Sequence, residues 1–344
     1  MRFGIFLTMD YYPGRSPDRA RFLREALDLV EFCDGLGLEV WVAEHHFSDY
    51  GVTPSPAAFL AAAAQRSRRV RLGAAVAVLP LHHPMRLAED FAFVDALSGG
   101  RLEFGVGSGY LAQEFAGFGL DPAERQARFE ESLDVILRAW RGEVVRHEGR
   151  HWRVDGARLN VLPVQSPHPP VWLGITRPEP APYAGRAGRD VLCVPYIRLS
   201  GDAELAQLAA EYRRGRREAG HAGEGRVGIA CHAFVGDTPW RGPQDPAYAP
   251  AEDALRLYLE TRRVPGARYE GRPVPRDFVW FGDAEQVARR VAAAQAAGVS
   301  LVLLLASFGG LRAELVRASL ERFARQVAPA FAGAADAAAA GGGS

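Results

Sequence analysis

The chain has 344 residues, of which 48% are hydrophobic and 24% charged, and its formal net charge at pH 7 is zero. This composition predicts a globular protein of one large domain or two ordinary ones, and it argues against nucleic acid or an acidic membrane as the main partner. All 41 basic residues are arginine. A chain without lysine excludes a Schiff-base aldolase, a pyridoxal-phosphate site and a lysine-containing phosphate loop, so a bound phosphate would need backbone N–H groups, hydroxyls or arginine.

Eight strand-like runs follow one another along the chain, with helical segments between them. Several of the runs are apolar throughout, as parallel strands covered on both faces should be. They lie at about residues 3–7, 40–44, 70–78, 102–107, 171–174, 191–194, 228–235 and 299–305. Eight strand–helix units over about 330 residues predict an α/β protein with a (β/α)8 TIM-type barrel rather than an open sheet.

Three helices carry clear start or stop signals. Ser16-Pro17 predicts an N-cap and a proline at the first helical position. The stretch from Asp121 to Glu124 resembles a capping box that begins a helix running to about Trp140. A helix from Met85 to Leu97 is expected to stop at Gly99-Gly100.

Two insertions interrupt the alternation, one after the fourth run and one after the seventh. Residues 143–165 predict a hairpin or an extended insertion, and residues 236–278 are too long for an ordinary loop. The second insertion is either a lid over the active face or a surface excursion with no role. We expect residues 1–330 to form a single domain and the Ala/Gly-rich residues 331–344 to be a disordered tail.

The cysteines and the apolar runs bear on the compartment. Cys33, Cys193 and Cys231 show no metal or redox spacing, which favours buried thiols in a reducing compartment. The N-terminal apolar run is too short for a signal peptide, and no run approaches the length of a membrane span. We therefore predict a cytoplasmic protein that does not use a membrane or nucleic acid as a partner.

Polar and small residues gather where the predicted strands end, which is where a barrel builds its site. Glu44, His45 and His46 follow the second strand, and a histidine there can move protons near neutral pH. The third strand ends in small residues that would let a flat group approach the backbone. The fourth runs into Gly105-Val106-Gly107-Ser108-Gly109-Tyr110, and the fifth into Thr176-Arg177. Ser108, Thr176 and Arg177 together predict a phosphate site.

Other residues leave two interpretations open. His82 and His83 either face a cofactor or substrate or are loop histidines, the second being favoured for His83. Tyr110 either lines a substrate pocket or packs ordinarily, and four aromatic residues in or beside the second insertion could shape that pocket: Trp240, Tyr248, Tyr258 and Trp280. His45 and His46 are adjacent, so on a strand they would point to opposite faces and make a poor shared metal site.

A set of motifs in this order and spacing resembles one known family, the luciferase-like flavin-dependent monooxygenases, or bacterial luciferase family. The resemblance covers about residues 1–330. Its carriers are Phe3-Gly4 with Phe6-Leu7, Glu44-His45-His46-Phe47, Val78-Leu79-Pro80, His83-Pro84, Ala88-Glu89-Asp90, Asp95, Leu97-Ser98, Gly100-Arg101, Phe104-Gly105, Glu114-Phe115, Phe118-Gly119, Phe308-Gly309-Gly310 and Pro329.

The resemblance implies a barrel that binds reduced FMN at the carboxyl ends of its strands. Such enzymes receive FMNH₂ from a separate reductase, and the flavin C4a-peroxide formed with O₂ oxidises an organic substrate. His45 matches the family's catalytic histidine, and Ala75-Val76 matches the place of a non-proline cis peptide beneath the isoalloxazine ring. Glu44, Ser108, Gly109, Tyr110, Thr176 and Arg177 are the other residues expected to bind the cofactor.

The sequence departs from bacterial luciferase at two positions. Gly107 stands where that relative has a reactive cysteine, and Ser108 stands where it has a phosphate-binding arginine, a charge that Arg177 could supply instead. These departures put a luminescent aldehyde reaction in doubt. The resemblance also suggests a homodimer packed through helices near the second and third strands.

Three rival functions stay open. The first is a deazaflavin (F420)-dependent oxidoreductase that transfers hydride on the same scaffold. The second is a non-catalytic flavin-binding protein, and a metal-dependent hydrolase is a distant third. The substrate and the position of oxygenation are not predicted by the sequence.

Overall fold

The computed structural model describes residues 1–48, 51–262 and 274–331. The strands are β1 (Arg2–Leu7), β2 (Glu39–Val42), β3 (Leu72–Val78), β4 (Leu102–Gly107), β5 (Val145–Glu148), β6 (Arg153–Ala157), β7 (Val171–Ile175), β8 (Asp190–Cys193), β9 (Val227–Val235), β10 (Val279–Gly282) and β11 (Leu301–Leu305). The helices are α1 (Arg19–Leu36), α2 (Pro56–Arg66), α3 (Pro84–Ser98), α4 (Ala112–Gly117), α5 (Arg125–Trp140), α6 (Ala181–Arg186), α7 (Asp202–Glu218), α8 (Ala249–Thr261), α9 (Ala284–Ala296) and α10 (Ala313–Arg322). Single turns of tighter or wider helix lie at η1 (Leu79–Leu81), η2 (Pro122–Glu124), η3 (Pro195–Ile197), η4 (Pro246–Tyr248), η5 (Arg276–Phe278), η6 (Phe323–Val327) and η7 (Ala328–Phe331).

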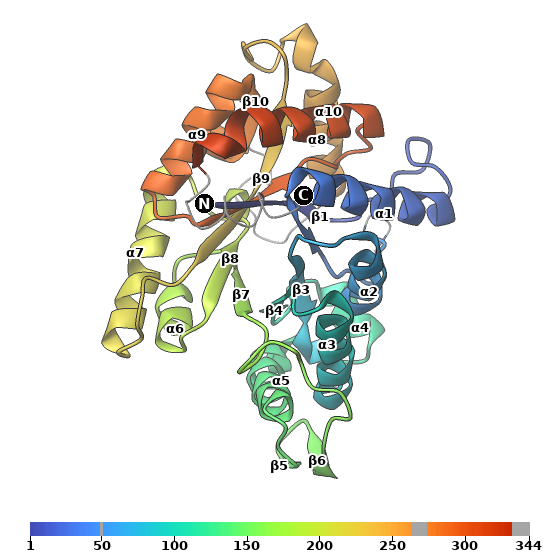
Figure 1. The fold of residues 1–344 in the computed structure, drawn as a ribbon, viewed down its shortest axis with the longest axis vertical. Helices are drawn as coiled ribbons and strands as arrows, with labels where there is room; N and C mark the ends of the chain where they lie inside the picture. The colour runs from blue at the N-terminus through green and yellow to red at the C-terminus, as the bar shows by residue number, and fades with distance from the viewer. Residues whose placement is uncertain (49–50, 263–273, 332–344) are drawn as a thin grey trace, which may run out of the picture.

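Eight parallel strands close into a barrel, as the sequence predicted. The ring runs β1-β2-β3-β4-β7-β8-β9-β11 and closes by the pairing of β11 with β1. The helices lie around this ring, with α5 and the β5–β6 hairpin at one edge and α8, α9 and α10 at the other (Figure 1). Every residue of β2, β4, β9 and β11 is buried, because the parallel strands have side chains packed on both faces.

One strand was missed by the sequence analysis. β10 pairs with the last four residues of β9, from Val279 opposite His232 to Gly282 opposite Val235. The first part of β9 lies between β8 and β11 in the closed ring, and the last part of this long strand pairs with β10. β10 has only four residues and follows a segment rich in proline and arginine, which is why its apolar run did not stand out.

The helix ends differ from the predicted ends by one to three residues. α1 begins at Arg19 with Asp18 as its N-cap, rather than after Ser16, because the Asp18 carboxylate accepts the Arg21 N–H. α5 starts at Arg125, after the separate turn η2 that the Asp121 side chain caps.

Both predicted insertions are present in the described residues. The first contains the antiparallel β5–β6 hairpin, which confirms the hairpin interpretation. The second holds η4 and α8, and its residues 263–273 lie outside the described part of the chain. Most of the predicted tail, residues 332–344, lies outside it as well.

The amino-end floor of the barrel is closed by two tryptophans and an ion network. Trp41 and Trp172 pack edge to face with ring centroids 5.5 Å apart. Their indole N–H groups donate to Glu39 (3.0 Å) and Glu103 (2.6 Å) respectively, and the Arg2 guanidinium bridges both carboxylates. This floor separates the barrel interior from solvent at the end opposite the strand ends that carry His45.

The chain ends and cysteines complete the fold. The Met1 ammonium donates to the Phe331 carbonyl at 2.8 Å, so the two ends of the described chain meet below the barrel. Cys33, Cys193 and Cys231 are free and buried, as predicted. None of the helices in the described residues has the length and apolar character that a membrane crossing needs.

Candidate active site

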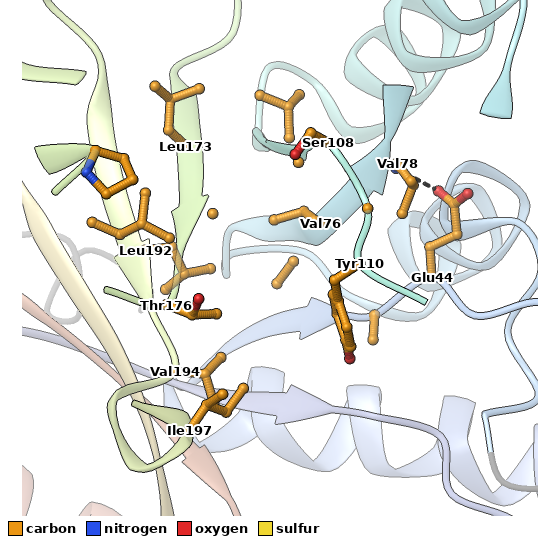
Figure 2. A pocket seen from close by; sticks show the side chains of 18 of the residues that line it. Glu44, Val76, Val78, Ser108, Tyr110, Leu173, Thr176, Leu192, Val194 and Ile197 are labelled. Carbon is orange, nitrogen blue, oxygen red and sulfur yellow. Dashed lines mark hydrogen bonds between the residues drawn. The ribbon is translucent and has the colours of Figure 1, made fainter. Parts of the chain in front are cut away.

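A cavity of about 390 Å³ opens at the carboxyl ends of the strands. This volume lies within the usual range for a small-molecule site. All nine residues proposed from the sequence line it: Glu44, His45, Ala75, Val76, Ser108, Gly109, Tyr110, Thr176 and Arg177. Figure 2 shows the Val76 side chain at the centre of the view with Ser108, Tyr110 and Thr176 around it.

The wall at Val76 has an unusual backbone. The peptide bond between Ala75 and Val76 is cis, at the position that the resemblance implied. The Val76 side chain points across two neighbouring strands, where it meets glycine each time. A Cβ added at Gly107 would lie 2.6 Å from Val76 Cγ2, and one added at Gly174 would lie 2.7 Å from Cγ1. Glycine at both positions makes room for the valine.

The glycine-rich stretch at the end of β4 also makes close contacts within the protein. A Cβ on Gly105 would come within 2.1 Å of the Ala74 carbonyl oxygen, and Gly109, at φ +77°, packs against Phe115 and Val78. Gly105 and Gly107 are thus held as glycine by their neighbours in β3. Their small size is needed for contact with β3.

His45 lies between a carboxylate and a guanidinium. Its Nδ1 is 3.2 Å from Glu114 Oε1, which also accepts the His46 N–H, and its Nε2 is 2.8 Å from Nη2 of Arg262. Burial lowers the pKa of His45 and the positive charge of Arg262 lowers it further, although the hydrogen bond to Glu114 acts to raise it. The net lowering favours a neutral imidazole at pH 7.

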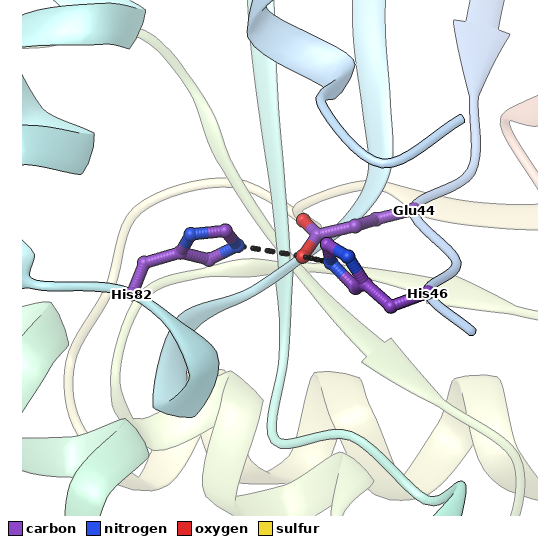
Figure 3. Close-up of side chains that lie close together, drawn as sticks. All are labelled: Glu44, His46 and His82. Carbon is purple, nitrogen blue, oxygen red and sulfur yellow. Dashed lines mark hydrogen bonds and ion pairs between the residues drawn. The ribbon is translucent and has the colours of Figure 1, made fainter. Parts of the chain in front are cut away.

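Glu44 is the centre of a buried ion-pair cluster (Figure 3). Its Oε1 accepts hydrogen bonds from His46 Nε2 at 2.8 Å and His82 Nε2 at 2.6 Å, and its Oε2 accepts the Val78 N–H at 3.0 Å. Burial acts to raise the pKa of Glu44, but the bonds from His46 and His82 outweigh it and lower that pKa to about 2. Burial acts to lower the pKa of His82, whereas Glu44 raises it, with a net rise.

The cluster brings His46 together with His82 rather than with His45. His45 turns toward Glu114 and His46 toward Glu44, so the two adjacent rings have different partners, as expected for neighbours at a strand end. His82 binds Glu44 and is absent from the cavity lining, while the ring of His83 packs against Trp152 at 5.2 Å. The loop interpretation is therefore the better one for both His82 and His83.

The hydroxyls and arginines proposed for a phosphate lie on the same cavity. Ser108 follows β4, and Thr176 and Arg177 follow β7, which pairs directly with β4. Arg177 is largely exposed and lies 3.7 Å from the Glu179 carboxylate. Arg125, at the start of α5, also lines the cavity and has no ion-pair partner among residues 1–48, 51–262 and 274–331. Sequence reasoning missed it because this helix was identified only from the capping signal at its start.

Sequence reasoning missed two more residues that line the cavity, Arg262 and Tyr196. Arg262 ends α8 and reaches His45, although nothing in its local sequence points to the barrel interior. Tyr196 lies in η3, lines the cavity and shares a 2.9 Å hydrogen bond with Tyr258. By contrast, the four aromatic residues suggested to shape the pocket, Trp240, Tyr248, Tyr258 and Trp280, are absent from its described lining.

A closed parallel barrel with a charged cavity at the carboxyl ends of its strands defines a protein of the (β/α)8 barrel class. Within that class, the chain belongs to the luciferase-like monooxygenase family, whose sequence model matches residues 1–301.

Named relatives agree with this assignment. The chain is 36% identical over 207 residues to limonene 1,2-monooxygenase of Rhodococcus erythropolis, covering 60% of this chain and 52% of that one. It is 25% identical to the oxygenase component of a flavin-dependent trigonelline monooxygenase of Acinetobacter baylyi, over 96% of both. The crystal structure of monooxygenase RslO1 from Streptomyces bottropensis superposes with a TM-score of 0.85 at 29% identity, covering 96% of this chain and 100% of that one.

Similarity also extends to proteins that use another cofactor. The chain is 34% identical over 177 residues to an F420-dependent glucose-6-phosphate dehydrogenase of Amycolatopsis mediterranei, covering 48% of this chain and 53% of that one. Several of the curated relatives are matched over only about half of their own length, from 52% to 56%.

Proposed function

We propose that this protein is a monooxygenase that uses reduced FMN and O₂ to oxidise a small organic substrate. The observation that carries the proposal is the meeting of three features in one cavity: His45, the cis Ala75–Val76 peptide, and the hydroxyl and arginine side chains that follow β4 and β7. Reduced flavin, when bound, supplies the electrons that activate O₂.

The residues present fit a flavin. Ala75 and Val76 provide an apolar surface for the flavin ring system. The arginines provide the positive charge that a flavin phosphate needs in a chain without lysine. Ser108, Thr176 and Arg177, with the additional Arg125, would hold the phosphate through hydroxyls and guanidinium groups. Gly109, Tyr110 and Glu44 complete the proposed cofactor wall.

The proposed role of His45 follows from its protonation. A neutral imidazole with a buried ring can accept a proton at Nε2 during turnover and return it, while the Nδ1 proton stays on the ring and is donated to Glu114 in a hydrogen bond. The apolar lining from Leu173, Leu192 and Ile197 would keep water from the reacting groups.

The decisive experiment mixes the protein with anaerobically reduced FMN and then with oxygenated buffer while absorbance is followed. A flavin–oxygen absorbance transient that outlives the oxidation of free reduced FMN would support the proposal. Oxidation at the rate of free FMN, without a transient, would contradict it.

A variant tests His45 separately. His45→Gln should retain the binding of reduced FMN, because the imidazole is not among the groups proposed to hold the phosphate, and should lower the rate of substrate oxidation about 10²- to 10⁴-fold. His83→Gln, which changes a histidine outside the cavity lining, is the matched control and should retain both properties.

Hydride transfer with F420 is the second candidate function, favoured by the similarity to an F420-dependent dehydrogenase. Equilibrium binding of reduced FMN and of F420 to the same preparation separates the two. Tighter binding of F420 with no oxygen-dependent transient would favour the dehydrogenase function. Binding of either cofactor with no turnover across a broad substrate panel would favour a flavin-binding role without catalysis.

Three further features belong to the proposal. A separate reductase would supply the reduced flavin, as the name of the trigonelline relative, an oxygenase component, implies for that protein. The chain would work as a homodimer, and its buried free cysteines favour the cytoplasm.

A further inference from the structure

Arg262, at the end of α8 in the second insertion, contacts the proposed acid–base residue His45. It is 6% exposed and follows the last residue of α8. Its Nη2 lies 2.8 Å from Nε2 of His45, a residue 217 positions earlier in the chain. Its guanidinium also lines the cavity, so this contact is made beside the space where a substrate would lie.

The contact decides which nitrogen of His45 carries the proton. A guanidinium has only donors, so Nε2 must accept from Arg262, and a carboxylate accepts, so Nδ1 must donate to Glu114. Only the neutral imidazole with its proton on Nδ1 satisfies both partners. A protonated ring would point an N–H at the guanidinium.

We propose that Arg262 is a positioning residue that fixes His45 as the Nδ1–H tautomer, so that Nε2 stays unprotonated and can accept a proton once the guanidinium releases its hydrogen bond. This inference rests on the proposed function, because it assigns to that function the atom that accepts the proton. It also gives the second insertion a role, since α8 delivers the guanidinium to the cavity.

Arg262 is itself held by several groups. Its Nη1 donates to the Tyr258 hydroxyl one helical turn earlier, and its charge lies over the Tyr258 ring at 5.1 Å from the centroid. Tyr258 in turn shares a hydrogen bond with Tyr196 of η3. Arg262 Nε lies 3.8 Å from Asp10 Oδ1, which supplies a compensating charge.

Among the described residues, the charged groups that act on His45 come from three parts of the chain. Glu114 of α4 and Asp10 after β1 favour the protonated ring, and Arg262 opposes it. Backbone groups also contact His45: its N–H donates to the Thr53 carbonyl, and Gly51 packs on the ring so closely that a Cβ there would lie 2.5 Å from His45 Cβ. Removing the guanidinium would leave two carboxylates and no opposing cation in this set, so His45 should become easier to protonate.

The test is a ¹⁵N NMR titration of the histidine rings in the full-length protein without flavin. His45→Gln assigns the His45 signals among the nine histidines. In the unchanged protein, Nε2 should show the shift of an unprotonated nitrogen. Arg262→Met should move the His45 midpoint to higher pH and populate the Nε2–H tautomer. Arg262→Lys, which keeps a charged donor, should restore most of the original behaviour.

Two further variants keep the result interpretable. Arg276→Gln removes a guanidinium that contacts α8 at Glu252 (3.4 Å), away from His45, and should leave the His45 signals unchanged. If Arg262→Met fails to fold because Asp10 loses its partner, Asp10→Asn/Arg262→Met removes both charges and carries the same test, its midpoint being compared with that of Asp10→Asn alone. An unchanged tautomer and midpoint in the Arg262→Met series would overturn the proposal.

This readout needs neither flavin nor oxygen. A protein that shows the expected His45 shifts but no flavin chemistry would refute the proposed function alone. A protein that oxidises a substrate with reduced FMN while Arg262→Met leaves the His45 ring unaffected would refute this inference alone.

Discussion

At the scale of single residues, Val76 and the glycines around it show how the cavity wall is built. The side chain of Val76 occupies space that a Cβ at Gly107 or Gly174 would otherwise take. Gly105 must be glycine for a different reason, because a Cβ there would meet the backbone carbonyl of Ala74, which cannot rotate away as a side chain can. Substitution by alanine should therefore be relieved by a smaller residue at position 76 in the case of Gly107 but not in the case of Gly105.

We expect Gly107→Ala to lower the free energy of unfolding by about 1–3 kcal/mol through overpacking against Val76. Val76→Ala should relieve this clash, so the double variant should be more stable than the sum of the two single effects predicts, by about 0.5–3 kcal/mol. Gly105→Ala is the matched control, since Val76→Ala leaves its backbone contact in place. Chemical denaturation of the unchanged protein, the three single variants and the two double variants with Val76→Ala measures both couplings, and strict additivity for Gly107 would contradict the packing argument.

The Glu44 cluster predicts a pH-dependent contribution to stability. The folded pKa of Glu44 is depressed from 4.5 to about 2, so the carboxylate stabilises the fold above pH 4.5 and loses this contribution as pH falls toward 2. The depression corresponds to about 3 kcal/mol. The pKa of His82 is raised from 6.5, so its contribution is complete below pH 6.5 and is lost as pH rises through the higher folded value.

The stability difference between the unchanged protein and Glu44→Gln should therefore be largest between pH 4.5 and 6.5, the two unshifted pKa values. Denaturant unfolding at several pH values measures it. Glu285→Gln, at a side chain that is 82% exposed, should show no such maximum. A difference that stays constant from pH 3 to 8 would show that the cluster is not an ion pair.

Sequence reasoning located residues that end apolar strands and missed those that arrive from elsewhere. Glu44 and His45 directly follow a recognisable buried run, so their place in the cavity could be predicted. Arg262 could not, because its approach to His45 depends on how α8 packs across the barrel rather than on any local pattern. The contact of His46 and His82 with the same Glu44 oxygen was missed for the same reason, because the two histidines come from different loops.

At the scale of elements, the strand beginnings carry stability while the strand ends carry the site. Glu103, at the second position of β4, is fully buried and contacts Arg2 at 2.6 Å and Arg226 at 3.5 Å. It is also paired with Arg71. Burial acts to raise the pKa of Glu103, and these three arginines lower it overall. One carboxylate thus joins segments before or within β1, β3, β4 and β9.

We expect Glu103→Gln to lower the free energy of unfolding by roughly 3 kcal/mol, because it leaves three guanidinium groups without their common partner. Flavin binding should be retained in the folded fraction, since the floor lies at the opposite end of the barrel from His45. Glu211→Gln, which removes an exposed helical pair with Arg214, should change stability little. Thermal unfolding together with FMN titration checks both properties, and a loss of FMN affinity in folded Glu103→Gln would contradict this separation.

The elements themselves were largely predictable because eight apolar runs alternate with helical segments. The exceptions have physical causes. β10 is short and enters the sheet only through the extension of β9 beyond the ring, which no local pattern reveals. The start of α1 depends on which of two possible caps, Ser16 or Asp18, reaches the first-turn N–H groups.

At the scale of the whole molecule, an exposed apolar patch is the feature that a lone barrel does not explain. Phe93 and Leu97 lie one helical turn apart on α3 and are 54% and 40% exposed. This patch, formed by Phe93 and Leu97, lies on the helix after β3, where the family resemblance predicted a dimer contact.

If this patch is the dimer contact, one added charge there should separate the subunits, because a two-fold interface would place it twice among apolar side chains. Sedimentation velocity should find the unchanged chain at twice the mass of Leu97→Glu at the same concentration. Leu23→Glu on α1, at a side chain of similar exposure (39% against 40%), should remain dimeric. A monomeric unchanged protein would refute the dimer, whereas a dimer that persists in Leu97→Glu would place its interface elsewhere. Because the patch lies on the outer layer of helices, the monomeric variant should still bind FMN, which would show that each barrel holds a complete cofactor site.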